Sequence, residues 1–202
     1  IVEIELIPET RDDRSDIYSA GLSIDSAFNP SSTLIPYNLT GGVTLSLTSP
    51  SSSGLFSGLT SVFSLSGSLE ESLVSSNIAL SANISGGEDS MAAKILLLED
   101  SLDLSSLVLS SYKGDLKYDR SVPEDVNYSN RDLVALKKVI NKEIPLVVRA
   151  NRASDILTLI KLAERRDINL IINGAEEGWR VSRQLAEAEI PVILQPIDNI
   201  PN

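Results

Sequence analysis

Apolar and polar positions alternate differently along the chain, and the clearest pattern lies in its last third. Three short apolar runs recur there about every 23 residues with helical periodicity between them, at 144–150, 168–174 and 190–196. Nearly continuous apolar runs are typical of strands that are covered on both faces. The spacing therefore predicts a parallel β/α fold, in which active sites lie at the carboxyl ends of the strands.

The first part of the chain, residues 1–88, carries the period-2 alternation of β-strands. A helix is expected near 17–27, before Asn29-Pro30 breaks it, and a strand within 40–50. The runs 59–65 and 78–84 alternate in the same way within a Ser-rich stretch. They predict short antiparallel strands joined near Ser66-Gly67.

Residues 89–142 show helical periodicity instead. One helical face is expected to carry Met91, Ile95, Leu98 and Leu102. A polar loop is expected over 113–128, followed by a capping box at Ser129–Asp132. The helix that starts there is expected to present Leu133, Leu136, Val139 and Ile140 on one face.

Two further helices are predicted between the three apolar runs of residues 143–202. Asn151 or Ser154 is suited to cap the first of them. Its inward face is expected to hold Ile156, Leu159, Ile160 and Ala163. Residues 174–179 open the second, which carries Val181, Leu185 and Ala188.

Composition narrows the classes of function. With 202 residues and 42% hydrophobic content the chain buries a substantial core, and we expect a single domain over 1–202. A formal charge of −11 argues against nucleic acid and anionic membranes as partners, since both require clustered Lys and Arg, and leaves a small-molecule substrate as the expected partner. No apolar stretch approaches the length of a membrane span. The absence of His and Cys excludes disulfides, cysteine metal sites and an ordinary catalytic triad.

The sequence does not decide the cellular compartment of the protein. Lack of cysteine fits the cytoplasm and the bacterial periplasm equally well. The chain starts at Ile1 without an initiator Met or the charged region of a signal peptide, and it closes on a short polar tail. We therefore expect that it is a piece of a longer protein whose N-terminus is missing.

Several segments resemble the amidohydrolase superfamily, with the closest likeness to its imidazolonepropionase-like branch. The likeness rests on Pro145-Leu-Val-Val-Arg-Ala-Asn-Arg-Ala-Ser-Asp-Ile156, on Gly174-Ala-Glu-Glu-Gly-Trp179 and on Pro191-Val-Ile-Leu-Gln-Pro196. Upstream, Phe28-Asn-Pro-Ser-Ser32 and Gly42-Val-Thr44 are similar to the segment that follows that branch's first metal motif. Together these segments cover most of the chain.

The resemblance implies a partial (β/α)8 barrel of the TIM-like, metal-dependent hydrolase type, with a small Ser-rich β insertion. About five barrel strands are expected in this chain, because a complete barrel takes about 250 residues. Members of the superfamily hydrolyse amide or cyclic amide bonds with water activated by one or two divalent metals, zinc being the usual first guess. By resemblance, the His-x-His pair lies before Ile1 and the metal-binding Asp lies after Asn202.

Two positions depart from the family pattern. Arg149 stands at the strand end where many relatives place a metal-binding His, and Asn173 stands where others have a second one. A guanidinium does not lose its proton at neutral pH, so Arg149 cannot coordinate a metal. No residue of this chain is predicted as a metal ligand or as a catalytic residue. Either the metal site is built outside the chain, or the metal has been lost.

Arg149, Asn173, Glu176 and Trp179 are the candidate substrate-binding residues. Arg149 is either an anion clamp at the mouth of the site or, as the acidic composition favours, half of an ion pair. Asn173 either contacts substrate or, the favoured interpretation, stabilises the turn before Gly174. Glu176 with its neighbour Glu177 either supplies a general base or favours a helix start, and the second is favoured. Trp179 is favoured as a core residue over a pocket wall.

These observations predict the central piece of a hydrolase that acts on carbon–nitrogen bonds, active in its complete form and inactive as the piece shown. The alternative is a non-catalytic binding domain derived from the same barrel, in which Arg149 recognises an anionic ligand. An incomplete barrel leaves its first and last strands without neighbours, so a homo-oligomer formed through exposed strand edges is also expected.

Overall fold

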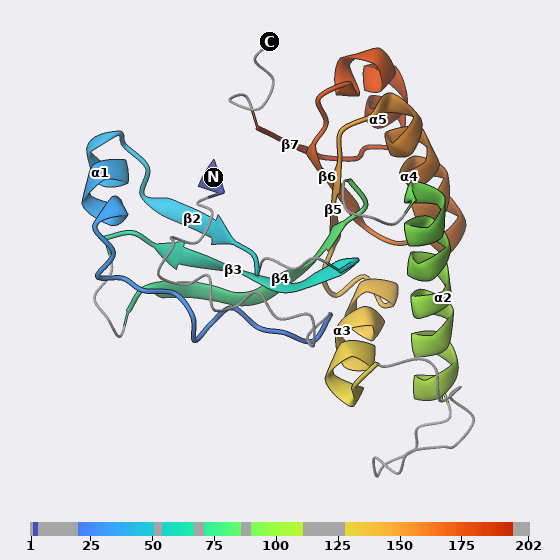
Figure 1. Cartoon of the computed structure of the whole chain (residues 1–202), viewed down its shortest axis with the longest axis horizontal. Coiled ribbons are helices and arrows are strands. Elements are labelled where there is room, and N and C mark those ends of the chain that lie inside the picture. Colours follow the sequence, from blue (N-terminus) through green and yellow to red (C-terminus); the bar gives the residue numbers. More distant parts are fainter. Residues whose placement is uncertain are drawn as a thin grey trace.

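The computed structural model describes residues 2–3, 20–50, 54–66, 71–85, 90–110 and 128–195, which form one mixed sheet flanked by helices (Figure 1). The strands are β1 (Val2–Glu3), β2 (Leu45–Thr48), β3 (Phe56–Ser64), β4 (Leu73–Asn83), β5 (Leu146–Ala150), β6 (Leu170–Gly174) and β7 (Val192–Leu194). The helices are α1 (Leu34–Thr40), α2 (Met91–Ser110), α3 (Asn130–Ile140), α4 (Ala153–Arg166), the 3-10 helix η2 (Gly178–Val181) and α5 (Ser182–Glu187).

The seven strands lie side by side in the order of the sequence. Strand β3 runs antiparallel to both of its neighbours, whereas β1 is parallel to β2 and β4 to β7 are mutually parallel. The three parallel strands predicted in the last third are confirmed as β5, β6 and β7, and the antiparallel pair predicted in the Ser-rich stretch is confirmed as β3 and β4. The described residues contain seven strands where about five barrel strands are expected, and the sheet curls as a partial barrel does.

Helices α2, α3 and α4 lie on one side of the parallel strands (Figure 1). The strand residues that face them are aliphatic and almost completely buried: Leu80, Ala82, Leu146, Val148, Ala150, Leu170 and Ile172. The helices contribute Leu98, Leu102, Leu136, Val139, Ile156, Leu159 and Leu162 to the same cluster. The inward faces predicted for α2, α3 and α4 are thus confirmed. This core fixes the orientation of β4, β5 and β6, which carry the candidate site.

Strands β2 and β3 bury hydroxyl groups as well as apolar side chains. On β2, Ser46 and Thr48 are buried while Leu45 is 41% exposed. On β3, Thr60 and Ser61 are buried; Thr60 Oγ1 lies 2.8 Å from the hydroxyl of Ser49. Hydrogen bonding therefore accompanies burial in this part of the sheet, as buried polar groups require.

The Asp25 carboxylate joins the segment before α1 to the β3–β4 pair. Ser61 Oγ donates to Asp25 Oδ1 over 2.5 Å, and Ser76 donates to the other carboxylate oxygen. Partial burial opposes ionisation of this group, but the hydroxyl donors outweigh it and lower the pKa of Asp25. The backbone of the same segment also contacts β3, because Leu59 N–H donates to Leu22 O over 2.7 Å.

These contacts explain why the helix predicted near 17–27 is wrong for the described residues 20–27, which form turns and an isolated bridge between Ser23 and Leu59. The backbone of this segment pairs with β3 and its acid accepts from serines, so tertiary hydrogen bonds replace helical ones. Helix α1 was not predicted. It is short, and Ile35 is its one buried residue.

Helix α3 begins as its sequence predicts. The Ser129 side chain accepts from Asp132 N–H, and the Asp132 carboxylate accepts from Ser129 N–H over 2.8 Å, which is the predicted capping box. The other oxygen of Asp132 accepts from Gly21 N–H over 2.6 Å. A Cβ at Gly21 would overlap the backbone of Arg131, so a glycine is needed where the N-terminal segment crosses α3.

Ion pairs hold α2 against α4 on the outer surface. Arg165 pairs with Glu99, and Arg166 forms a two-pronged pair with Asp103, whose longer contact is 2.9 Å. The hydrogen bond from Arg166 outweighs partial burial and lowers the pKa of Asp103. These ion pairs help to orient α2 relative to α4, whereas the buried part of the contact between the two helices is aliphatic.

Some predictions lie outside the described residues: the loop over 113–127, Gly67 of the predicted turn and the last residues of the third apolar run. Among the helices that the structure describes, none has the length and apolar character needed to cross a membrane.

Candidate functional site

Three polar residues stand in one row at the carboxyl ends of neighbouring parallel strands. Asn83 of β4 is in register with Arg149 of β5, which is in register with Asn173 of β6. Residues in register on adjacent strands share a face of the sheet, and the strands are spaced about 4.8 Å apart. We call Asn83, Arg149 and Asn173 the polar row. The structure thus brings together both strand-end candidates predicted from the sequence.

The polar row lies on the face of the sheet opposite the helices. Side chains alternate between faces along a strand, and Val148 and Ile172 belong to the helix-covered core. Their neighbours Arg149 and Asn173 therefore point to the other side, which would be the interior if the sheet closed into a barrel. Asn173 is 7% exposed, whereas Arg149 and Asn83 are half-buried.

The polar row is rich in hydrogen-bond donors and contains no carboxylate. A guanidinium presents five N–H groups in a planar fork, and each amide adds two more. Asn83 is already oriented, because its Oδ1 accepts from Ser85 N–H over 2.9 Å. Such a row is complementary to carboxylate or carbonyl oxygens of a small molecule.

The loops that follow β5 and β6 are joined directly beyond the polar row. Ala175 N–H donates to Ala150 O over 3.0 Å, and Asn151 Nδ2 donates to Glu176 Oε1 over 2.8 Å. Gly174 has φ +95°, and a Cβ there would overlap Asn151 Oδ1. Only glycine meets both requirements without strain, so this position fixes how closely the two loops approach.

Glu177, which lies in the loop after β6, caps helix α4, which follows β5. Its Oε2 accepts from Ala153 N–H, the first residue of α4, over 2.8 Å. The prediction that Asn151 or Ser154 caps α4 is wrong: the N-cap is Arg152, which makes no side-chain cap bond. The side chains of Asn151 and Ser154 donate instead to Glu176 and Asp155, and the cap comes from the neighbouring β/α unit.

Glu176 and Trp179 lie after the end of β6 and outside the polar row. Glu176 accepts from Asn151, and Trp179 stands on η2 with 75% of its surface exposed. The favoured core interpretation of Trp179 is therefore wrong. The helix expected to open within 174–179 begins at Gly178, as a single 3-10 turn that continues into α5.

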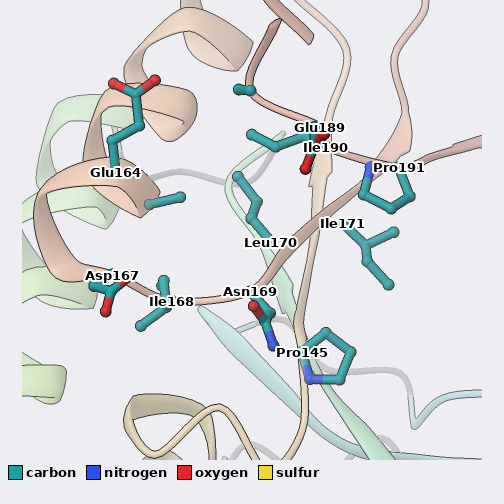
Figure 2. A pocket seen from close by; sticks show the side chains of 12 residues that line it. Pro145, Glu164, Asp167, Ile168, Asn169, Leu170, Ile171, Glu189, Ile190 and Pro191 are labelled. Carbon is teal, nitrogen blue, oxygen red and sulfur yellow. The ribbon is translucent and has the colours of Figure 1, made fainter. Parts of the chain in front are cut away.

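One cavity of about 430 Å³ lies beside these loops. It is lined by Arg152, Ala153, Ser154, Leu157, Glu177, Arg180 and Val181. A second cavity of about 440 Å³ lies at the opposite end of the sheet, where the loops leading into β5, β6 and β7 meet (Figure 2). Figure 2 shows Pro145, Asn169, Ile190 and Pro191 from these loops around it. In parallel β/α folds, that amino end contributes to stability and the carboxyl end carries the chemistry.

The described residues do not fit a divalent metal of the zinc type. The polar row offers amide oxygens and a guanidinium, and the chain has no His or Cys. Among the described residues, no group of three or more His, Cys, Asp or Glu side chains is placed to hold a metal ion. Zinc requires about four nitrogen, sulfur or carboxylate ligands around one point. The side chains of the polar row offer hydrogen bonds to a bound molecule.

Sequence reasoning missed Asn83 and Asn151. Asn83 is absent from the predicted candidates because the Ser-rich strands were predicted as antiparallel strands, whereas β4 also pairs in parallel with β5. Its place near the end of an alternating run marks Asn83 as a strand-end residue, but no local pattern shows that β4 lies beside β5. For Asn151 no local signal existed, because its partners Glu176 and Gly174 lie more than twenty positions away in the sequence.

Comparison with known proteins gives a match at the level of structure. No family model matches the sequence, and no curated protein matches it. The crystal structure of an amidohydrolase from Thermotoga maritima MSB8 is similar, with a TM-score of 0.78 and 23% sequence identity. The similarity covers 92% of this chain and 50% of that protein. The chain therefore shares the fold of this amidohydrolase and spans half of that protein's length.

Proposed function

We propose that the chain is the substrate-binding centre of a hydrolase that acts on carbon–nitrogen bonds of cyclic or other non-peptide amides. The observation that carries the proposal is the polar row at the carboxyl ends of β4, β5 and β6, in a sheet with the fold of an amidohydrolase. Strand ends are where β/α folds build their sites. The sequence resemblance to the imidazolonepropionase-like branch supports the same class of substrate.

In this proposal the chain binds and orients the substrate. Arg149 holds a carboxylate or carbonyl oxygen through its fork, and the amides of Asn83 and Asn173 hydrogen-bond to oxygens or N–H groups on either side. In the amidohydrolase class a divalent metal, with zinc expected, supplies the activated water. Because the described residues do not fit that metal, we place its ligands outside the described residues.

The test is a binding and activity panel of cyclic amides and N-acyl dipeptides that carry a free carboxylate. Arg149→Ala is expected to weaken binding at least about tenfold, the scale of one bidentate charge-assisted pair. Arg183→Ala is the matched control, because Arg183 pairs with Glu187 on the surface of α5 over 2.7 Å. Equal affinity of the Arg149→Ala and unmodified chains for every compound would refute this role for Arg149.

A second candidate is a non-catalytic binding domain built on the same fold, and Arg149 in place of a metal-binding residue favours it. The full-length gene product separates the two. Hydrolysis of a bound amide together with stoichiometric metal supports the enzyme. Binding of the same amide without hydrolysis and without metal supports the binding domain.

A further inference from the structure

The cavity beside α4 and η2 concentrates positive charge in an acidic protein. Two of its seven lining residues are arginines, Arg152 and Arg180, while the whole chain has a formal charge of −11. Glu177 is the one acid among the seven, so the lining carries a net charge of about +1 at neutral pH. This differs from the polar row, because the cavity lies beside the loops and is lined by none of Asn83, Arg149 and Asn173.

Both guanidiniums have donors available. Within the part of the chain that the structure describes, the Arg152 side chain is paired with no carboxylate. Arg180 lies 3.6 Å from Glu177, beyond the usual N–H···O distance of about 2.9 Å. By contrast, Arg165, Arg166 and Arg183 each have a carboxylate in direct contact. Arg152 and Arg180, which both have unused hydrogen-bonding capacity, thus border one cavity together.

The cavity also has an apolar wall. Val181 is 4% exposed, and Leu157 is partly buried against the aliphatic core. A volume of about 430 Å³ falls at the lower end of the range of small-molecule pockets, about 300–1,000 Å³. Cationic forks beside apolar side chains are complementary to a compact molecule that has an anionic group and an apolar body.

The attraction of the cavity for an anion does not depend on the N-terminus of α4. The first amide of that helix, Ala153 N–H, is already bound by Glu177 Oε2 over 2.8 Å. An anion entering the cavity is held by the two guanidiniums and is opposed by the Glu177 carboxylate. A tetrahedral dianion accepts from two forks at once, which favours a phosphoryl group over a single carboxylate.

We propose that the cavity lined by Arg152, Arg180, Leu157 and Val181 binds a small phosphate monoester. This inference is independent of the function proposed for the polar row, because it concerns different residues and a different ligand class. Phenyl phosphate is the probe, with inorganic phosphate and phenol as its two parts. Chemical shifts of the backbone amides of Arg152, Ser154 and Arg180 report occupancy in the intact chain.

Phenyl phosphate is expected to shift these amides in a saturable manner, with a dissociation constant of about 1 mM or lower. Inorganic phosphate is expected to bind more weakly, since it leaves the apolar wall in contact with water, and phenol weakest of all. Absence of saturation, or equal affinity for phenol and phenyl phosphate, overturns the proposal.

Substitutions test the same point without altering the core. Arg152→Gln and Arg180→Gln together remove both charges and are expected to weaken phenyl phosphate binding at least about tenfold. Arg183→Gln changes the charge on α5 outside the cavity and is expected to leave binding unchanged. Glu177→Gln keeps an oxygen for Ala153 N–H and removes the opposing charge, so binding is expected to tighten about threefold. Unchanged affinity in the double variant overturns the proposal.

Discussion

In strands β2 and β3 the buried residues include Ser46, Thr48, Thr60 and Ser61, whereas β5 and β6 bury aliphatic side chains against α2, α3 and α4. The hydroxyls are held by one another and by the Asp25 carboxylate. Order in the first region therefore depends on hydrogen-bond geometry as well as on the burial of Phe56 and Phe63, whereas order in the second depends on shape and volume. The candidate site stands on the second region, with β4 joining the two.

The largest expected effect comes from the aliphatic region. Leu146→Ala removes a side chain that has 0% exposure in the centre of the parallel strands. We expect the free energy of unfolding in urea to fall by about 2–5 kcal/mol, because a cavity remains where the side chain was. Leu96→Ala is the control: Leu96 is 60% exposed, and its loss is expected to cost less than about 0.5 kcal/mol. Similar losses for both would contradict the assigned core.

Gly174→Ala tests the junction between the loops after β5 and β6. The added Cβ would overlap Asn151 Oδ1 at a backbone with φ +95°, so we expect a loss of about 1–3 kcal/mol. Gly42→Ala is a matched control, since Gly42 has φ +85° with no atom within 4 Å of the added Cβ. Thermal unfolding of the two variants separates backbone strain from overlap. Equal losses would show that Asn151 does not set the distance between the loops.

In the hydroxyl region, Ser61→Ala removes the donor to Asp25 and the acceptor for Asn77 N–H, which is 2.9 Å away. A loss of about 1–2 kcal/mol is expected, together with faster amide hydrogen exchange at Asn77. Ser75→Ala alters an exposed serine on β4 and should leave both measurements unchanged. Unaltered exchange at Asn77 in Ser61→Ala would show that the Ser61 hydroxyl does not order this region.

The smallest expected effect is at the surface. The pKa of Asp103 is lowered by Arg166, so the stability from this pair is complete above the ordinary carboxyl pKa of 3.8 and is lost as pH falls through the lowered value. Asp103→Asn should therefore reduce the acid dependence of unfolding below about pH 4 by a few tenths of a kcal/mol, since the pair is exposed. Asp167→Asn, on the exposed pair with Lys142, is the comparison. A larger effect of Asp167→Asn would contradict the assignment.

The β/α units were predictable because several independent sequence patterns indicate the same elements. Apolar runs, helical faces and the Ser129 capping box all indicate the same elements, and the structure has them. The polar row was partly predictable, since Arg149 and Asn173 end such runs. Asn83 required knowledge that β4 is parallel to β5, which no local pattern contains.

The failures share a physical cause. Residues 20–27 lack the predicted helix because Asp25 binds serines that lie 36 and 51 positions later in the sequence. Helix α4 is capped by Glu177, 24 positions after the amide that it binds. In both cases a distant partner replaces a local one, and the free energy of that contact decides the local structure.

Burial of hydroxyls on β2 and β3 has a thermal consequence. Exposing apolar surface raises the heat capacity by about 0.45 cal/mol/K per Å², and exposing polar surface lowers it by about 0.26. Unfolding β2, whose buried residues are Ser46 and Thr48, therefore adds less heat capacity per residue than unfolding β5 and β6. Since hydrophobic stabilisation weakens on cooling, the β/α units lose more of their stability in the cold than β2 does.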